Sequence, residues 1–155
     1  KELEDAQLCK IGKRLWQSGA NIDAVNEDGV TPLTMAAKNG HKKLVKFLVR
    51  YSANINFELR NSVKLYSNVL REAIASKQVD VISYLVKQGA TPFLTGYTDN
   101  YEILDKLYQL SPNVAKRAAA NFPEKSAGWI PLVKSDQRAS DNVDKSAKFL
   151  QRQMR

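Results

Sequence analysis

Two side chains in this sequence are of the kinds most often used in nucleophilic or metal chemistry, Cys9 and His41, and each is the only one of its type. A thiol nucleophile needs a nearby base and a group that orients this base, and a structural zinc site needs several cysteine or histidine ligands. One residue of each type does not complete either set. The sequence also lacks a Gly-x-Ser-x-Gly turn and a phosphate-binding glycine loop. We therefore expect no catalytic residue, no metal and no cofactor within these 155 residues.

Cys9 has two interpretations: a reactive thiol, or a small core residue on an apolar helical face. A single cysteine forms no internal disulfide, which favours a reducing compartment and an intracellular, cytoplasmic location. The sequence has no apolar run of membrane-spanning length and no signal-peptide pattern, so we expect a soluble protein.

The net charge of +8 is unevenly distributed. Residues 113–155 hold nine Lys or Arg against four acids, and the range 42–50 carries the basic side chains of Lys42, Lys43, Lys46 and Arg50. Such a face is either solvated or binds phosphate or an acidic partner. The basic C-terminal segment suggests nucleic-acid binding as a lesser alternative, but it lacks stacked aromatic residues and a Gly-rich RNA motif.

The sequence pattern of helices is clearest between Asn26 and Asn56, a stretch that includes His41 and the basic residues of 42–50. Thr31-Pro32 predicts a helix start, because threonine caps exposed N–H groups and proline suits the first helical position. Asn39-Gly40 predicts its end, and a second helix follows with an apolar stripe. Asp28-Gly29 predicts a tight turn upstream.

This stretch resembles an ankyrin repeat, a unit of about 33 residues with a TPLH-like start. The matching motifs are Gly29-x-Thr31-Pro32-Leu33, Ala36-Ala37, Asn39-Gly40-His41, Val45-x-x-Leu48 and Ala53-Asn54-Ile55-Asn56. His41 then stands at the family's usual turn position. Motifs related to Ser52-Ala53 occur 33 residues upstream, at Gly19-Ala20, and 37 residues downstream, at Gly89-Ala90. They predict a partial first repeat and a degenerate third repeat. The resemblance covers about residues 8–94.

The third repeat has an enlarged finger loop, residues 57–66, whose apolar residues either fold onto the array or face a partner. Ser67 is expected to cap the helix that follows, and Ser52 is expected to strain a helix end that carries glycine in the neighbouring repeats. Two further helices, at about 99–110 and 112–122, are consistent with a diverged fourth pair. Trp129 either anchors onto the array or is exposed, and residues 135–155 read as one more helix that packs on this array, on another subunit or on a missing part of the protein.

The resemblance implies an all-α solenoid of stacked helix pairs with hairpin-like fingers, organised as repeats at 1–94 and a helical extension or cap at 95–155. It also implies protein–protein interaction through a rigid concave surface of fingers and first helices, with the partner's identity unspecified. The sequence starts partway through a repeat, so we expect a fragment of a larger protein. The expected partner-binding residues are Glu27, Asp28, Val30, Lys38, Asn39, Tyr51, Arg71, Ala75 and Ser76, with Gln88 in a comparable place.

The alternative function is that of a targeting or regulatory segment of a multidomain enzyme, such as a bacterial effector delivered into the host cytosol. Ankyrin arrays are often joined to catalytic domains, so the two hypotheses differ in what flanks the chain.

Overall fold

The computed structural model describes residues 2–60, 66–95, 101–130 and 151–153. These ranges are mainly helical, which confirms the predicted all-α class. The elements are α1 (Glu2–Gln17), α2 (Pro32–Lys38), α3 (Lys42–Arg50), β1 (Glu58–Arg60), β2 (Tyr66–Asn68), α4 (Val69–Ala75), α5 (Val79–Lys87), α6 (Glu102–Leu110), α7 (Pro112–Asn121) and α8 (Pro123–Ser126).

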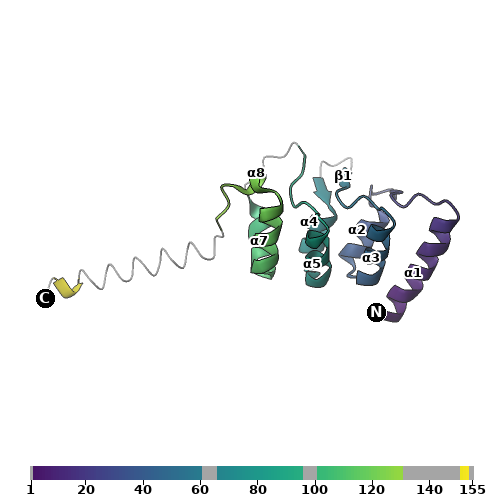
Figure 1. Ribbon diagram of the computed structural model, residues 1–155, viewed down its shortest axis with the longest axis horizontal. Coiled ribbons are helices and arrows are strands. Elements are labelled where there is room, and N and C mark those ends of the chain that lie inside the picture. Colours follow the sequence, from purple (N-terminus) through teal and green to yellow (C-terminus); the bar gives the residue numbers. More distant parts are fainter. Residues whose placement is uncertain (1, 61–65, 96–100, 131–150, 154–155) are drawn as a thin grey trace.

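The helices stack as pairs in two layers. Helices α2 and α3, α4 and α5, and α6 and α7 pack against each other as pairs, and the pairs form a row that starts with α1 (Figure 1). Contacts between successive pairs join α2, α4 and α6 into a first-helix layer, and α1, α3, α5 and α7 into a second-helix layer. The predicted solenoid of helix pairs is therefore confirmed.

The two seven-residue first helices, α2 and α4, each begin at a side-chain cap, which stabilises such a short element. Thr31 caps α2 by accepting a hydrogen bond from the backbone N–H of Thr34 at 3.3 Å, and the two threonine hydroxyls are 3.0 Å apart. Helix α4 is capped by Asn68, whose Oδ1 accepts from the backbone N–H of Arg71 at 2.9 Å. The predicted cap, Ser67, is wrong by one residue, because its hydroxyl instead donates to Glu72 Oε1 at 2.7 Å.

The helix ends adopt left-handed backbone geometry, as the repeat pattern predicts. Gly40 and Gly89 have φ values of 74° and 90°, whereas Ser52 and Lys77 occupy the corresponding turns at 69° and 55°. Non-glycine residues are disfavoured in this region because the Cβ crowds the following carbonyl oxygen. The backbone at Ser52 therefore has the strained geometry that the sequence predicts.

Replacing Ser52 by glycine is expected to raise the free energy of unfolding by about 0.5–1 kcal/mol, because the relief of strain exceeds the extra entropy of the unfolded glycine. Denaturant unfolding followed by circular dichroism measures the change. Ser18→Gly, beside the glycine that already occupies this turn in the first repeat (φ 85° at Gly19), serves as the control and should not stabilise. A loss of stability in Ser52→Gly would contradict the strain at this position.

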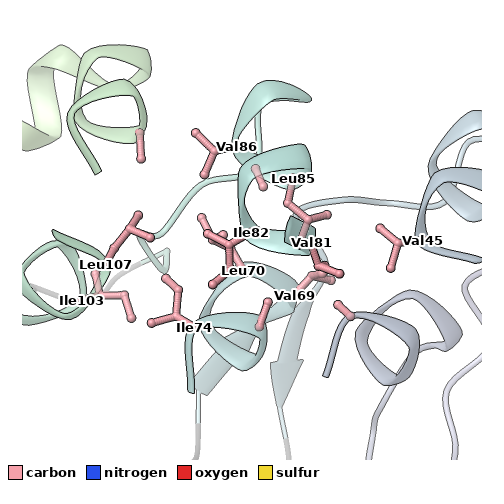
Figure 2. Close-up of a cluster of buried hydrophobic side chains, with 14 of the residues drawn as sticks. Val45, Val69, Leu70, Ile74, Val81, Ile82, Leu85, Val86, Ile103 and Leu107 are labelled. Carbon is pink, nitrogen blue, oxygen red and sulfur yellow. The ribbon is translucent and has the colours of Figure 1, made fainter. Parts of the chain in front are cut away.

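One apolar core runs through the stack from pair to pair (Figure 2). Leu33 of α2, Leu70 of α4 and Leu107 of α6 are fully buried, and so is Leu85 of α5. Figure 2 shows side chains from three successive helix pairs: Val45 from α3, Leu70 and Leu85 from α4 and α5, and Leu107 from α6. The repeats therefore share one continuous core. This is the arrangement in which each repeat is stabilised by its neighbours.

Helix α1 leaves much of its apolar face uncovered. The exposed fractions of Leu3, Ile11 and Leu15 are 82%, 55% and 55%. The reason is that α1 packs on α3, and no described first helix lies beside it. Trp16 packs on the neighbouring repeat, where its ring centroid lies 4.6 Å from that of Tyr51.

The enlarged finger and Trp129 both contact the array. Strands β1 and β2 pair antiparallel, with Leu59 opposite Ser67, and Leu59 is buried. The indole N–H of Trp129 donates to Asp105 Oδ1 at 3.0 Å, and its ring meets Tyr108 edge-on at 6.0 Å. Trp129 is thus an anchor. The finger tip at 61–65 and most of the predicted last helix, apart from 151–153, lie outside the described residues.

Candidate protein-binding surface

The finger of the middle repeat is a rigid turn organised by one side chain. Asn26 Oδ1 accepts hydrogen bonds from the backbone N–H groups of Asp28 and Val30, each at 3.0 Å. Gly29 completes the turn with a φ of 75°. Glu27 and Asp28 are consequently held exposed at the tip, while Val30 is half-buried at its base.

The turns that follow the first helices are tied to each other across repeats. Lys38 and Asn39 are exposed at the end of α2, and the Lys38 carbonyl accepts from Gln78 Nε2 at 3.4 Å. Ser76 ends α4 in the same way that Asn39 ends α2, with its N–H bonded back into the helix. Successive repeats therefore present these turns at a fixed spacing.

A groove of about 620 Å³ lies between α4 and α6, and we call it the α4–α6 groove. It exists because α6 packs mainly on its own partner α7 and only lightly on α4, whereas α4 packs closely on α2. Two predicted residues, Arg71 and Ala75, line this groove. Lys77, which follows Ser76 in the chain, also lines the groove, and so does Ser67 at the base of the enlarged finger.

The lining of the α4–α6 groove combines apolar and charged side chains. Ile74, Ile103 and Leu110 supply the apolar part, and Arg71, Lys77 and Lys106 supply positive charge next to the single acid Glu72. Arg71 is positioned by its own hydrogen bond, from Nε to the carbonyl of Pro92 at 2.8 Å. Lys106 meets Glu102 at 3.0 Å, but both side chains are more than half exposed, so this ion pair holds Lys106 only weakly. Such a lining suits an amphipathic polypeptide segment.

Sequence reasoning missed the contribution of α6 to this groove. Ile103, Lys106 and Leu110 belong to the fourth helix pair, where the repeat motif is lost and no equivalent positions can be read. The apolar periodicity of α6 predicts which of its side chains are buried. It does not predict the distance between α6 and α4, on which the groove depends.

Tyr51 is the predicted site residue that the structure separates from the others. It lies in a second groove between α1 and α3, where its ring contacts both Trp16 and Phe47 with centroid distances of 4.6 Å. Gln88 is exposed at the end of α5 and belongs to neither groove. The remaining predicted residues fall on the finger, the turns and the α4–α6 groove.

Cys9 lines the groove between α1 and α3, half-buried. Burial raises the pKa of the Cys9 thiol above its ordinary value, the carboxylate of Asp5 adds to this effect, and Lys43 opposes it. A raised pKa keeps the group in the unreactive thiol form at neutral pH. Among the described residues no group of three or more His, Cys, Asp or Glu side chains is placed to hold a metal ion, and no helix there is long and apolar enough to cross a membrane.

Fold and surface together define a class: a helical repeat protein that presents fingers, turns and a groove on a rigid array. The family model for ankyrin repeats matches residues 5–95 in three copies. The chain belongs to the ankyrin repeat family, and as such it is a protein–protein interaction module.

Relatives of known sequence or structure agree with this assignment. Ankyrin repeat and SAM domain-containing protein 6 is 36% identical over 81 residues in both Mus musculus and Rattus norvegicus, which is 50% of this chain and 9% of each relative. The chain thus spans only a small part of the length of these relatives. A chain from the solved complex of a predatory endopeptidase of Bdellovibrio bacteriovorus with an immunity protein superposes with a TM-score of 0.60 at 26% identity, over 77% of this chain and 60% of that one.

Proposed function

We propose that this chain binds a protein partner through the surface made by the fingers and first helices, centred on the α4–α6 groove. The observation that carries the proposal is the separation of α6 from α4, which leaves apolar and basic side chains together in a groove of about 620 Å³. The residues assigned to the partner are Glu27, Asp28 and Val30 on the finger, Lys38, Asn39 and Ser76 on the turns, and Arg71 and Ala75 in the groove.

The rigidity of this surface supports a binding role. The finger, the turns and Arg71 are all fixed by hydrogen bonds within the array. A surface that is ordered before binding loses little conformational entropy when a partner docks. The similar chain of known structure comes from a complex of two proteins, which is consistent with a protein ligand. We place this binding inside the cell, since the single cysteine is compatible with a reducing compartment.

The test places a bulky charge in the groove. Ala75 is exposed at the end of α4 and lines the groove, so Ala75→Arg is expected to weaken partner binding at least about tenfold by filling the docking site. Partners are captured from nuclease-treated lysate on the immobilised full chain, identified, and measured by titration against the parent and the variant.

Ala120→Arg is the matched control, because Ala120 is also exposed near the end of a helix, α7, but lies outside the groove lining. Circular dichroism verifies that both variants keep the helical content of the parent. Equal binding by the parent and Ala75→Arg would contradict the assignment of the groove. A loss in both variants would show that the effect comes from added charge rather than from the groove.

A further inference from the structure

Five basic side chains from two helices converge on the groove between α1 and α3, which is distinct from the surface proposed above. Lys10 and Lys13 come from α1, and Lys43, Lys46 and Arg50 come from α3. All five are exposed, and they surround a space of about 370 Å³ together with Cys9, Phe47 and Tyr51. We call this site the α1–α3 groove.

The width of the α1–α3 groove is set by two features that bring the helices together. The carboxylate of Asp5, only 6% exposed, accepts hydrogen bonds from the backbone N–H groups of Lys43 at 2.8 Å and Leu44 at 2.9 Å. This side chain from α1 therefore caps the start of α3. Gly12 permits a close approach further along, since a Cβ there would lie 3.3 Å from Phe47 Cε1. The basic residues are thus held on a preformed frame.

The positive charge of this groove is not neutralised by the described part of the chain. None of the five basic side chains forms an ion pair with an acid in the described ranges, and Lys46 alone is engaged, over the ring of Tyr84 at 5.6 Å. The buried acid of α1, Asp5, is already hydrogen-bonded to the backbone of α3. Clustered like charges repel one another, so an anionic ligand gains from relieving this repulsion as well as from direct attraction.

The shape of the groove favours carboxylates of a polypeptide over a nucleic acid. Proteins that bind single strands combine a basic track with open aromatic faces on which bases stack. Here the ring of Tyr51 packs against Trp16 and Phe47, and the charge is concentrated in one short groove rather than along a track. We propose that the α1–α3 groove binds an acidic, Asp- or Glu-rich segment of a protein. This interaction site is separate from the finger surface, by which we mean the fingers and first helices around the α4–α6 groove.

The test uses fluorescein-labelled hexaglutamate as the probe and measures its anisotropy with the full chain at low salt. The variant Lys13→Gln, Lys46→Gln, Arg50→Gln removes three charges from the groove. The control Lys87→Gln, Lys116→Gln, Arg117→Gln removes three exposed charges from α5 and α7. The groove variant and the control variant therefore have the same net charge. The groove variant is expected to bind about tenfold more weakly than the parent, and the control to stay within about twofold.

A second readout comes from Cys9, which lines the groove. Because the thiol is unreactive at neutral pH, the reaction with iodoacetamide is run at mildly alkaline pH, where part of Cys9 is ionised. Bound hexaglutamate is expected to slow this alkylation, whereas binding at a remote surface would not cover Cys9. The variant Ala75→Arg is expected to bind the probe like the parent, so that failure of this proposal and failure of the finger-surface proposal are distinguishable.

Three results would overturn the proposal. If the groove variant and its control lose the same amount of affinity for hexaglutamate, the binding depends on net charge alone and not on the groove. Unchanged binding in the groove variant would remove the groove from the interaction. Tighter binding of a labelled oligothymidine than of hexaglutamate, lost in the same groove variant, would assign the site to nucleic acid instead.

Discussion

Replacing Leu70 by alanine is expected to lower the free energy of unfolding by about 2–5 kcal/mol. Leu70 is fully buried in α4, at the centre of the core in Figure 2. The alanine removes apolar contacts and leaves a cavity that packed helices on several sides cannot easily close. Because α4 lies between α2 and α6, the loss also weakens the coupling between repeats.

The measurement is denaturant unfolding followed by far-ultraviolet circular dichroism. A domain of this kind has a total stability of about 5–15 kcal/mol, so the variant loses a large fraction of it. Val79→Ala is the control, since 42% of the Val79 surface is exposed at the start of α5 and its expected loss is below about 1 kcal/mol. Similar losses in the two variants would show that Leu70 is not at the centre of a tightly packed core.

Replacing Asn68 by alanine is expected to cost about 2–3 kcal/mol, a large effect for one polar side chain. Asn68 is 1% exposed and makes two hydrogen bonds in different directions. Its Oδ1 caps α4, and its Nδ2 donates to the carbonyl of Thr91 at 2.8 Å. The alanine leaves the backbone N–H of Arg71 and the carbonyl of Thr91, both part-buried, without these partners, and each unsatisfied group carries a desolvation penalty.

The variant Asn68→Asp separates the two contributions. The aspartate keeps the cap acceptor for α4 but has no donor for the Thr91 carbonyl. Its loss of stability is therefore expected to differ from that of Asn68→Ala, with the start of α4 retained and the contact to the next repeat broken. Thermal and denaturant unfolding measure both variants. Full stability of Asn68→Ala would exclude a structural role for either hydrogen bond.

The repeat pattern predicts one of the two helix caps correctly and misplaces the other by one residue. Thr31 was predicted as a cap from the TP pair and is one. In the degenerate third repeat, the prediction chose Ser67 over Asn68, although Asn68 aligns with Thr31 across the insertion. In the structure Asn68 both caps α4 and donates to the carbonyl of Thr91, whereas the Ser67 hydroxyl donates to Glu72. The contact with Thr91 spans 23 residues and therefore leaves no local pattern in the sequence.

The helix pairs, the turns and the family of this protein were predictable from its sequence. Those features depend on contacts a few residues apart, such as the cap from Thr31 to Thr34 and the left-handed turn at Gly40, and such contacts leave a periodic signal in the chain. Three features could be recognised only in the folded chain: the α4–α6 groove, the place of Tyr51 in the α1–α3 groove and the cap that Asp5 forms on α3. Asp5 and Lys43 are 38 residues apart, and the distance between α4 and α6 follows from how whole helices pack. No local pattern encodes these contacts, because their energy arises only after separate repeats have been brought together.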